Sequence, residues 1–116
     1  MDFCAVISFP SYKPTYYTLD IMHKLLEDNP SKECRRRYYR TIRGGADGFI
    51  KRKEVREFIF NRDGRRCVIC GSEDRLSIDH INSVYSVVYK NSLNPMLLNS
   101  KENLRTLCAS CNSKHL

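Results

Sequence analysis

The chain has 116 residues, with 20 Lys and Arg side chains against 13 Asp and Glu, and a net charge of +7 at pH 7. This length suits a single domain with an appended arm and is too short for two full hydrophobic cores. Apolar residues make up 41% of the chain, which excludes general disorder, and they form no run long enough for a membrane span. The first residues lack the basic and apolar segments of a secretory signal, so we expect a cytoplasmic protein that is not secreted.

The N-terminal part carries weak structural signals. Residues 3–9 are expected to form a short strand, and residues 18–28 a helix, because their apolar residues follow helical spacing. The glycine-rich segment 44–48 is expected to break the chain. It would separate an N-terminal region, residues 1–46, from a second domain, residues 47–116.

The positive charge is concentrated in residues 35–66, which hold twelve basic and four acidic side chains, whereas the rest of the chain has a net charge of −1. Such a block favours a surface that binds nucleic acid, since each neutralised phosphate releases a counterion. A solvated basic face is the alternative explanation. The basic residues expected to contact nucleic acid here are Arg35, Arg36, Arg37, Arg40, Lys51, Arg52 and Lys53.

Residues 51–61 are expected to form an amphipathic helix, because Val55, Phe58 and Ile59 fall on one side of it. The segment 62–66, Arg-Asp-Gly-Arg-Arg, then predicts a turn. This turn leads directly into the first of two cysteine pairs.

The two pairs, Cys67-x-x-Cys70 and Cys108-x-x-Cys111, are separated by 37 residues. Two thiolates at this spacing can bind one ion from a tight knuckle, and two knuckles complete the tetrahedral shell of a structural Zn²⁺. A redox-active pair and buried thiols are the alternatives. Because four sulfur ligands leave no open position, we expect this zinc to stabilise the fold and to take no part in chemistry.

Between the pairs, residues 76–81 are expected to form a short strand with one buried face. Asp79 and His80 would then point to opposite sides at the end of the strand. A carboxylate beside an imidazole offers an oxygen ligand for a metal ion and a base that is neutral near pH 7.

Taken together, Cys67-x-x-Cys70, Asp79-His80-Ile81, Asn103-Leu104 and Leu107-Cys108-x-x-Cys111-Asn112 with Lys114 resemble the HNH endonuclease family in its four-cysteine, zinc-bearing branch. The resemblance covers about residues 50–116. It implies a small ββα-metal (His-Me finger) domain. Together with a basic, mainly helical N-terminal region before it, the expected fold class is α+β. The resemblance also implies metal-dependent hydrolysis of phosphodiester bonds in double-stranded DNA, as in phage, mobile-element or restriction nucleases.

The resemblance assigns a role to each motif position. Asp79 would be a metal ligand, and His80 the general base that takes a proton from the attacking water. Asn103 would hold the loop that follows His80 by hydrogen bonds. Asn112 would be the second metal ligand, and His115, three residues further on, could replace or join it.

A metal shell of one carboxylate and one amide suits Mg²⁺ or Mn²⁺, with water and phosphate oxygens as the other ligands. Arg105 and Lys114 lie within the motif as candidate phosphate contacts. The long segment 82–100 is apolar enough to pack over the core or to contact a partner, and an irregular excursion beside the DNA is the alternative.

Two other functions remain open at this stage. A non-catalytic nucleic-acid-binding module stabilised by zinc would keep the cysteines and the basic block, but would not need the four catalytic positions together. A thiol-redox protein would need cysteines that zinc does not occupy. The sequence does not distinguish a monomer from a homodimer.

Overall fold

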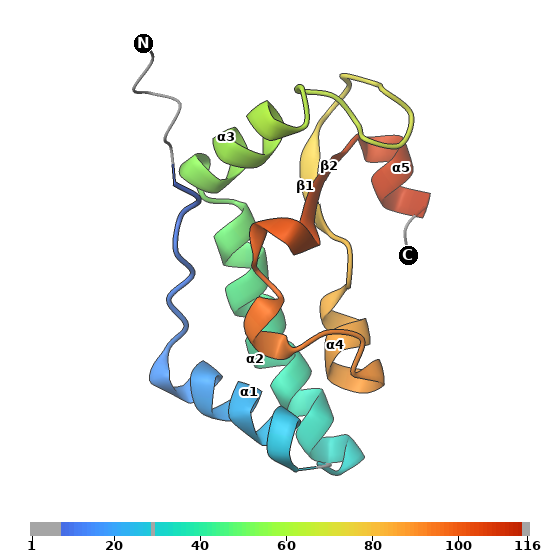
Figure 1. Cartoon of the computed structure of the whole chain (residues 1–116). Helices are drawn as coiled ribbons and strands as arrows, with labels where there is room; N and C mark the ends of the chain where they lie inside the picture. The colour runs from blue at the N-terminus through green and yellow to red at the C-terminus, as the bar shows by residue number, and fades with distance from the viewer. Residues whose placement is uncertain (1–7, 29, 115–116) are drawn as a thin grey trace.

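The computed structural model describes residues 8–28 and 30–114. In chain order its elements are α1 (Tyr16–Glu27), α2 (Lys32–Ile50), α3 (Lys53–Arg62), β1 (Ser77–His80), α4 (Val84–Lys90), the 3₁₀ turns η2 (Pro95–Leu97) and η3 (Lys101–Asn103), β2 (Leu104–Leu107) and α5 (Ala109–Lys114). A helical N-terminal region thus precedes a two-stranded sheet and a final helix (Figure 1), which confirms the predicted α+β class. Within the described ranges, no helix combines the length and the hydropathy of a membrane span.

Helix α1 confirms the first predicted helix and begins two residues before its expected start. The side chain of Thr15 caps it by accepting a hydrogen bond from the backbone N–H of Thr18 at 3.1 Å. Its buried residues Ile21, Met22 and Leu25 face the core. The strand expected at residues 3–9 falls largely outside the described residues, and its last two positions have no regular secondary structure.

Helix α2 corrects the prediction of a break at residues 44–48, because it runs through them without interruption. Ile42, Ala46 and Phe49 are buried at helical spacing, so tertiary packing outweighs the low helix propensity of glycine. Gly45 lies where Tyr12 packs against the helix, and a Cβ atom there would come within 2.5 Å of the Tyr12 hydroxyl. The boundary expected between residues 46 and 47 therefore falls inside a helix.

The two strands form an antiparallel pair in which Asp79 lies opposite Arg105 and His80 lies opposite Leu104. Because side chains alternate along a strand, each strand gives one set of residues to each face. Ile78 and Leu104 pack against Val55 and Ile59 of α3. The other face is covered by α5 and the four cysteines. The short sheet thus lies between α3 on one side and α5 with the cysteine cluster on the other, and Figure 1 shows the two helices on opposite sides of the strands.

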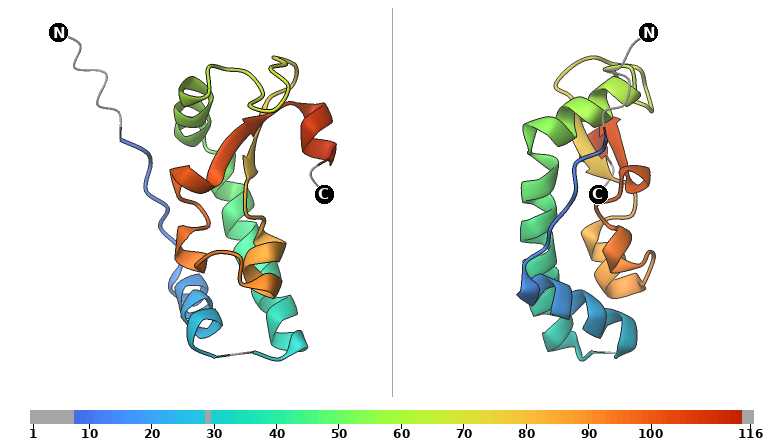
Figure 2. Two further views of the ribbon diagram at one scale, coloured as in Figure 1. Left: turned by 45° about the vertical axis from the view of Figure 1, so that its right-hand side comes forward. Right: turned by 60° about the vertical axis from the view of Figure 1, so that its left-hand side comes forward.

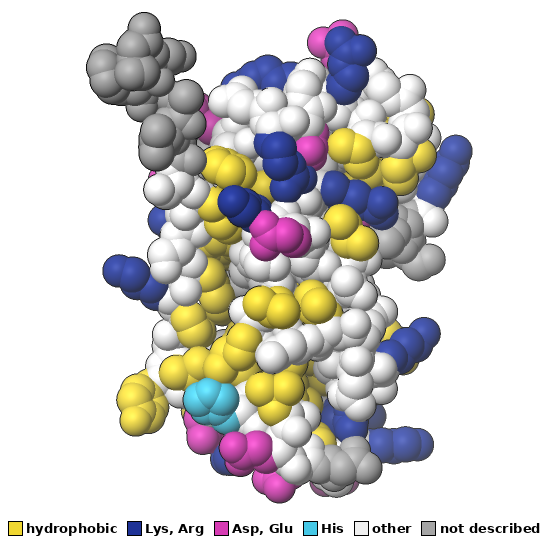
Figure 3. Space-filling view, in the orientation of Figure 1, with side chains coloured by type: hydrophobic (Ala, Val, Ile, Leu, Met, Phe, Trp, Pro, Cys, Tyr) yellow, Lys and Arg dark blue, Asp and Glu magenta, His cyan; other side chains and the backbone are white. Residues whose placement is uncertain are grey.

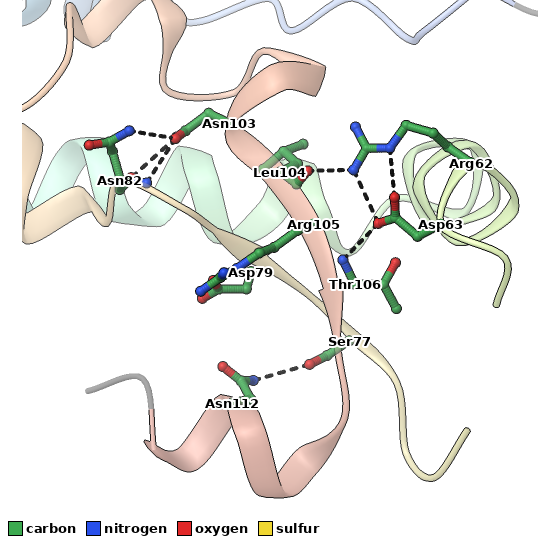
Figure 4. Close-up of polar contacts among 10 residues, drawn as sticks. All are labelled: Arg62, Asp63, Ser77, Asp79, Asn82, Asn103, Leu104, Arg105, Thr106 and Asn112. Atoms are coloured by element: carbon green, nitrogen blue, oxygen red, sulfur yellow. Dashed lines mark hydrogen bonds and ion pairs between the residues drawn. The ribbon is translucent and has the colours of Figure 1, made fainter. Parts of the chain in front are cut away.

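The outer edge of β2 is paired with side chains at the end of α3. Asp63 accepts a hydrogen bond from the backbone N–H of Thr106 at 2.9 Å, and Arg62 donates to the carbonyl of Leu104 at 2.6 Å (Figure 4). Val68, in the first knuckle, donates to the carbonyl of Thr106 at 3.1 Å. These contacts satisfy backbone groups that an edge strand would otherwise expose, and they fix the first knuckle beside β2.

Helix α4 shows that the segment 82–100 packs over the core. Val87 and Val88 are buried against Ile42 and Ala46 of α2. The guanidinium of Arg35 adds a hydrogen bond of 2.5 Å to the carbonyl of Val88. Figure 2 shows α2 as a long helix that extends from the region of the sheet to α1 and α4.

Candidate metal and catalytic site

The four paired cysteines form one cluster. Their sulfur atoms all lie within 4.8 Å of one another, and the sulfurs of Cys70 and Cys108 are 3.6 Å apart. Tetrahedral Zn²⁺ with Zn–S bonds of about 2.3 Å requires sulfurs separated by about 3.8 Å. Gly71 turns the first knuckle with a φ of +79°, in the left-handed region that favours glycine. The geometry therefore fits the predicted four-sulfur zinc site.

The ionisation of these thiols also suits a cation. Burial opposes ionisation of Cys67, but backbone N–H groups of its neighbours prevail and lower its pKa to about 6. Hydrogen bonding to the Cys70 sulfur, together with burial, raises the pKa of Cys111 to about 12. The cluster thus loses protons unevenly without a metal, and a bound Zn²⁺ would stabilise all four thiolates.

Asp79, the expected ligand of the catalytic metal, forms an ion pair across the two strands. Arg105 Nε lies 3.0 Å from Asp79 Oδ2, and both side chains are largely buried (Figure 4). Arg105, which we expected to contact phosphate, is held by this carboxylate. A metal ion that binds Asp79 must compete with the guanidinium.

Asn112, the other expected ligand, lies on the same face as Asp79. Its side-chain Nδ2 donates a 3.1 Å hydrogen bond to the hydroxyl of Ser77, two residues before Asp79 on β1 (Figure 4). This bond orients the amide and leaves the carbonyl Oδ1 as the atom that can bind a cation. Lys114 is exposed at the end of α5, and His115 lies outside the described residues.

His80, the expected base, is 7% exposed and ends strand β1 beside Asp79. The pleat of the strand directs it to the opposite face, where its Nε2 lies 2.8 Å from Oδ1 of Asn99. Burial lowers the pKa of His80, although the Asn99 hydrogen bond and the charges of Asp79 and Asp47 oppose this effect. The imidazole is therefore neutral at pH 7. Its hydrogen-bond partner is thus a side-chain amide.

Asn103 lies immediately before β2 and holds the segment that follows His80. Its Oδ1 accepts a 2.8 Å hydrogen bond from the backbone N–H of Asn82, and its Nδ2 donates to the carbonyls of Asn82 and Leu98 at 3.2 and 2.8 Å. These bonds also fix the chain next to Asn99. Sequence reasoning missed Asn99, since it is one of several amides in a long connection and has no spacing signal.

The residues expected to bind nucleic acid differ in their surroundings. Arg35 is tied to the carbonyls of Pro30 and Val88, and Arg52 to Glu54 and the carbonyl of Ser11. Five others are exposed: Arg36, Arg37, Arg40, Lys51 and Lys53. A hollow beside α3 is lined by Lys51, Lys53, Arg56 and Arg65, together with Glu57 and Phe60.

Comparison with known proteins adds an independent finding. Residues 67–115 match the family model described as HNH endonuclease. No curated protein and no solved structure matches the chain. An HNH domain indicates a nuclease or another nucleic-acid-related function. Residues 67–115 are thus similar to the HNH endonuclease family, and the four clustered cysteines fit its zinc-bearing branch.

Proposed function

We propose that this protein is a metal-dependent endonuclease that hydrolyses phosphodiester bonds in double-stranded DNA. The observation that carries the proposal is the position of Asn112, whose amide is hydrogen-bonded to Ser77 on the face of β1 that holds Asp79. A carboxylate and an amide oxygen on one face form a donor set suited to Mg²⁺ or Mn²⁺. Such an ion would stabilise negative charge on the scissile phosphate and on the leaving oxygen.

In this proposal, Arg105 changes partner during the reaction. Its guanidinium neutralises Asp79 when no divalent ion is bound. A divalent ion held by Asp79 would replace this ion pair and would leave the guanidinium on the face of the sheet that would meet the substrate. A guanidinium there is well suited to contact a phosphate oxygen.

His80 is the proposed general base. Because Oδ1 of Asn99 can only accept, the proton of the imidazole resides on Nε2, and Nδ1 is the nitrogen that carries the lone pair. The lowered pKa of the ring keeps it neutral, as a base must be at pH 7. Asn103 is proposed to limit the movement of the adjoining loop through its contacts with Asn82.

The exposed cations of α2 and α3 are proposed to bind the phosphate backbone of the same DNA. Resemblance to small HNH nucleases favours a cytoplasmic setting in a bacterium or in a phage-infected cell. The proposed phosphate contacts require no particular target sequence, because contacts with the DNA backbone position a protein without reading bases.

Two observations favour a second candidate, a non-catalytic nucleic-acid-binding module stabilised by zinc. His80 is buried on the face opposite Asp79, and Asp79 is already neutralised by Arg105. Both features would suit a domain that keeps its fold and its basic surface without catalysis.

Incubation with supercoiled plasmid distinguishes the two candidates. The wild-type protein should nick or linearise the plasmid with Mg²⁺ or Mn²⁺ and should lose this activity in EDTA. His80→Ala should abolish cleavage while DNA binding, measured by gel shift, stays within about twofold. Binding without cleavage across a full panel of divalent ions would support the non-catalytic module. Cleavage by His80→Ala at the wild-type rate would refute the assigned base.

A further inference from the structure

A group of stacked tyrosines and basic residues lies on α2 and α4, away from Asp79 and Asn112. We call it the α2–α4 patch, and its members are Arg36, Tyr39, Arg40 and Arg43 of α2 with Tyr85, Tyr89 and Lys90 of α4. The ring centroids of Tyr85 and Tyr89 are 4.7 Å apart, and that of Tyr39 lies 6.2 and 6.0 Å from them. Two helices that are far apart in the sequence thus build one surface.

The cations of the α2–α4 patch are accessible. Arg36, Arg40 and Arg43 recur at positions i, i+4 and i+7 and so share one side of α2, and all three are exposed. Lys90, at the end of α4, is also exposed. Among the residues that the structure describes, the acid paired with them is Asp47, 3.5 Å from Arg43. The patch therefore keeps a positive charge that favours a polyanion.

The geometry of the rings indicates which part of a nucleic acid would bind. One face of Tyr85 is stacked on Tyr89, and the ammonium of Lys90 lies 6.0 Å from the centre of its ring. The guanidinium of Arg43 lies 5.7 Å from the centre of the Tyr39 ring, and its Nη1 donates a 2.7 Å hydrogen bond to the Tyr39 hydroxyl. Because Tyr85 and Tyr89 are stacked on each other, the surface offers cations and the hydroxyl groups of these two rings to a ligand. Such groups bind phosphate oxygens, whereas stacking of a base requires an open ring face.

The position of the patch relates it to the candidate site. Helix α4 lies in the connection between β1 and β2, and it appears below α5 on the same side of the molecule in Figure 1 and in the left view of Figure 2. Dark-blue side chains follow this side in the space-filling view of Figure 3. A DNA backbone that leaves the face of α5 along this side would pass over α4.

We propose that the α2–α4 patch is a second DNA-contact surface, which binds the phosphate backbone of the substrate duplex beyond the cleavage position. The inference rests on the proposed function, since it takes DNA as the substrate. It assigns a role to the segment between the two strands: α4 completes a phosphate-binding surface together with α2. The contacts are electrostatic and should not depend on base sequence.

The test is the salt dependence of binding by a double variant, Arg40→Ala with Lys90→Ala, measured by fluorescence anisotropy. If each lost cation contacts one phosphate, the slope of log K against log salt concentration should become shallower by about 1.8 on a duplex of about 30 base pairs. On a duplex of about one helical turn, about 10 base pairs, the change should be much smaller, because the DNA does not reach both surfaces. Tyr85→Phe, which removes only a hydroxyl, should weaken binding about twofold to fivefold.

A second double variant serves as the control. Lys24→Ala with Arg75→Ala removes the same charge from exposed positions that are ion-paired with Asp20 and Asp74. Its slope should stay close to that of the wild type, and thermal melts should show that all variants are folded. An unchanged slope in the patch variant, an equal loss in the control, or a larger loss on single-stranded than on duplex DNA would overturn the inference. Plasmid cleavage is measured separately. If the wild type cleaves and the patch variant binds DNA normally, only the proposed role of the patch is refuted. If DNA binds through the patch but is never cleaved, only the nuclease activity is refuted.

Discussion

The pair formed by His80 and Asn99 gives a prediction that combines stability with ionisation. Replacing Asn99 by alanine removes the acceptor 2.8 Å from Nε2 and leaves a buried N–H without a partner. An unpaired buried donor costs about 1–3 kcal/mol. The Nδ2 of Asn99 is itself buried without a partner among the described residues, and its removal offsets about 1 kcal/mol. We therefore expect Asn99→Ala to lose at most about 2 kcal/mol of unfolding free energy.

The same variant should shift the titration of His80. Burial holds the pKa of His80 below its ordinary value of 6.5, and the Asn99 hydrogen bond opposes that effect. Without Asn99, the pKa of His80 should fall further. Because the unfolded state then binds the proton more readily, stability is complete above about pH 6.5 and declines as the pH falls toward the folded-state pKa. In Asn99→Ala this decline should continue to lower pH than in the wild type.

Urea unfolding at several pH values and NMR titration of the His80 ring test both parts. Asn61→Ala, which removes an exposed amide at the end of α3, should change neither quantity and serves as the control. A wild-type pKa of His80 in the Asn99→Ala variant would refute the reasoning. A drop in stability without a change in titration would show that Asn99 acts only through packing.

Two further predictions concern the metal sites. Cys108→Ser should release zinc and unfold the C-terminal half, because structural zinc contributes directly to folding, and circular dichroism with zinc quantification measures this. A soluble, zinc-free and fully active Cys108→Ser variant would refute the structural role. Arg105→Ala should strengthen Mn²⁺ binding about tenfold in calorimetry, since the ion no longer displaces a charge-assisted hydrogen bond from Asp79. Lys114→Ala, which removes an equal charge nearby, is the control, and weaker binding by Arg105→Ala would show that the arginine assists the ion.

The cysteine cluster could be predicted from the sequence because its chemistry fixes the spacing of its residues. A tetrahedral sulfur shell requires two close pairs, and Cys67 with Cys70 meets Cys108 with Cys111 in the structure. The helices were predictable where apolar residues repeat with helical period, as in α1 and α3. These signals are local, so a single sequence contains them.

The partners of the charged residues could not be predicted in this way. Arg35 and Arg62 belong to a basic block expected to face DNA, yet both donate hydrogen bonds to backbone carbonyls of distant segments. The glycine-rich segment 44–48 remains helical because residues of α2 pack into two hydrophobic clusters, Ile42 and Ala46 into one and Phe49 into the other. Asn99 meets His80 only through the fold of the connection between the strands. Each outcome depends on contacts between residues that are remote in the sequence.

The two-stranded sheet packs against helices that precede it in the chain. Two strands of four residues bury too little surface to be stable alone. The cysteine cluster covers one face, but the other face packs on α3, and the connection between the strands packs Val87 and Val88 on Ile42 of α2. The segment that matches the HNH family therefore depends on a core built largely by residues that precede it. Leu98, the neighbour of Asn99 in the chain, belongs to that core, so substitutions at the buried positions of α2 should also affect the contact between Asn99 and His80.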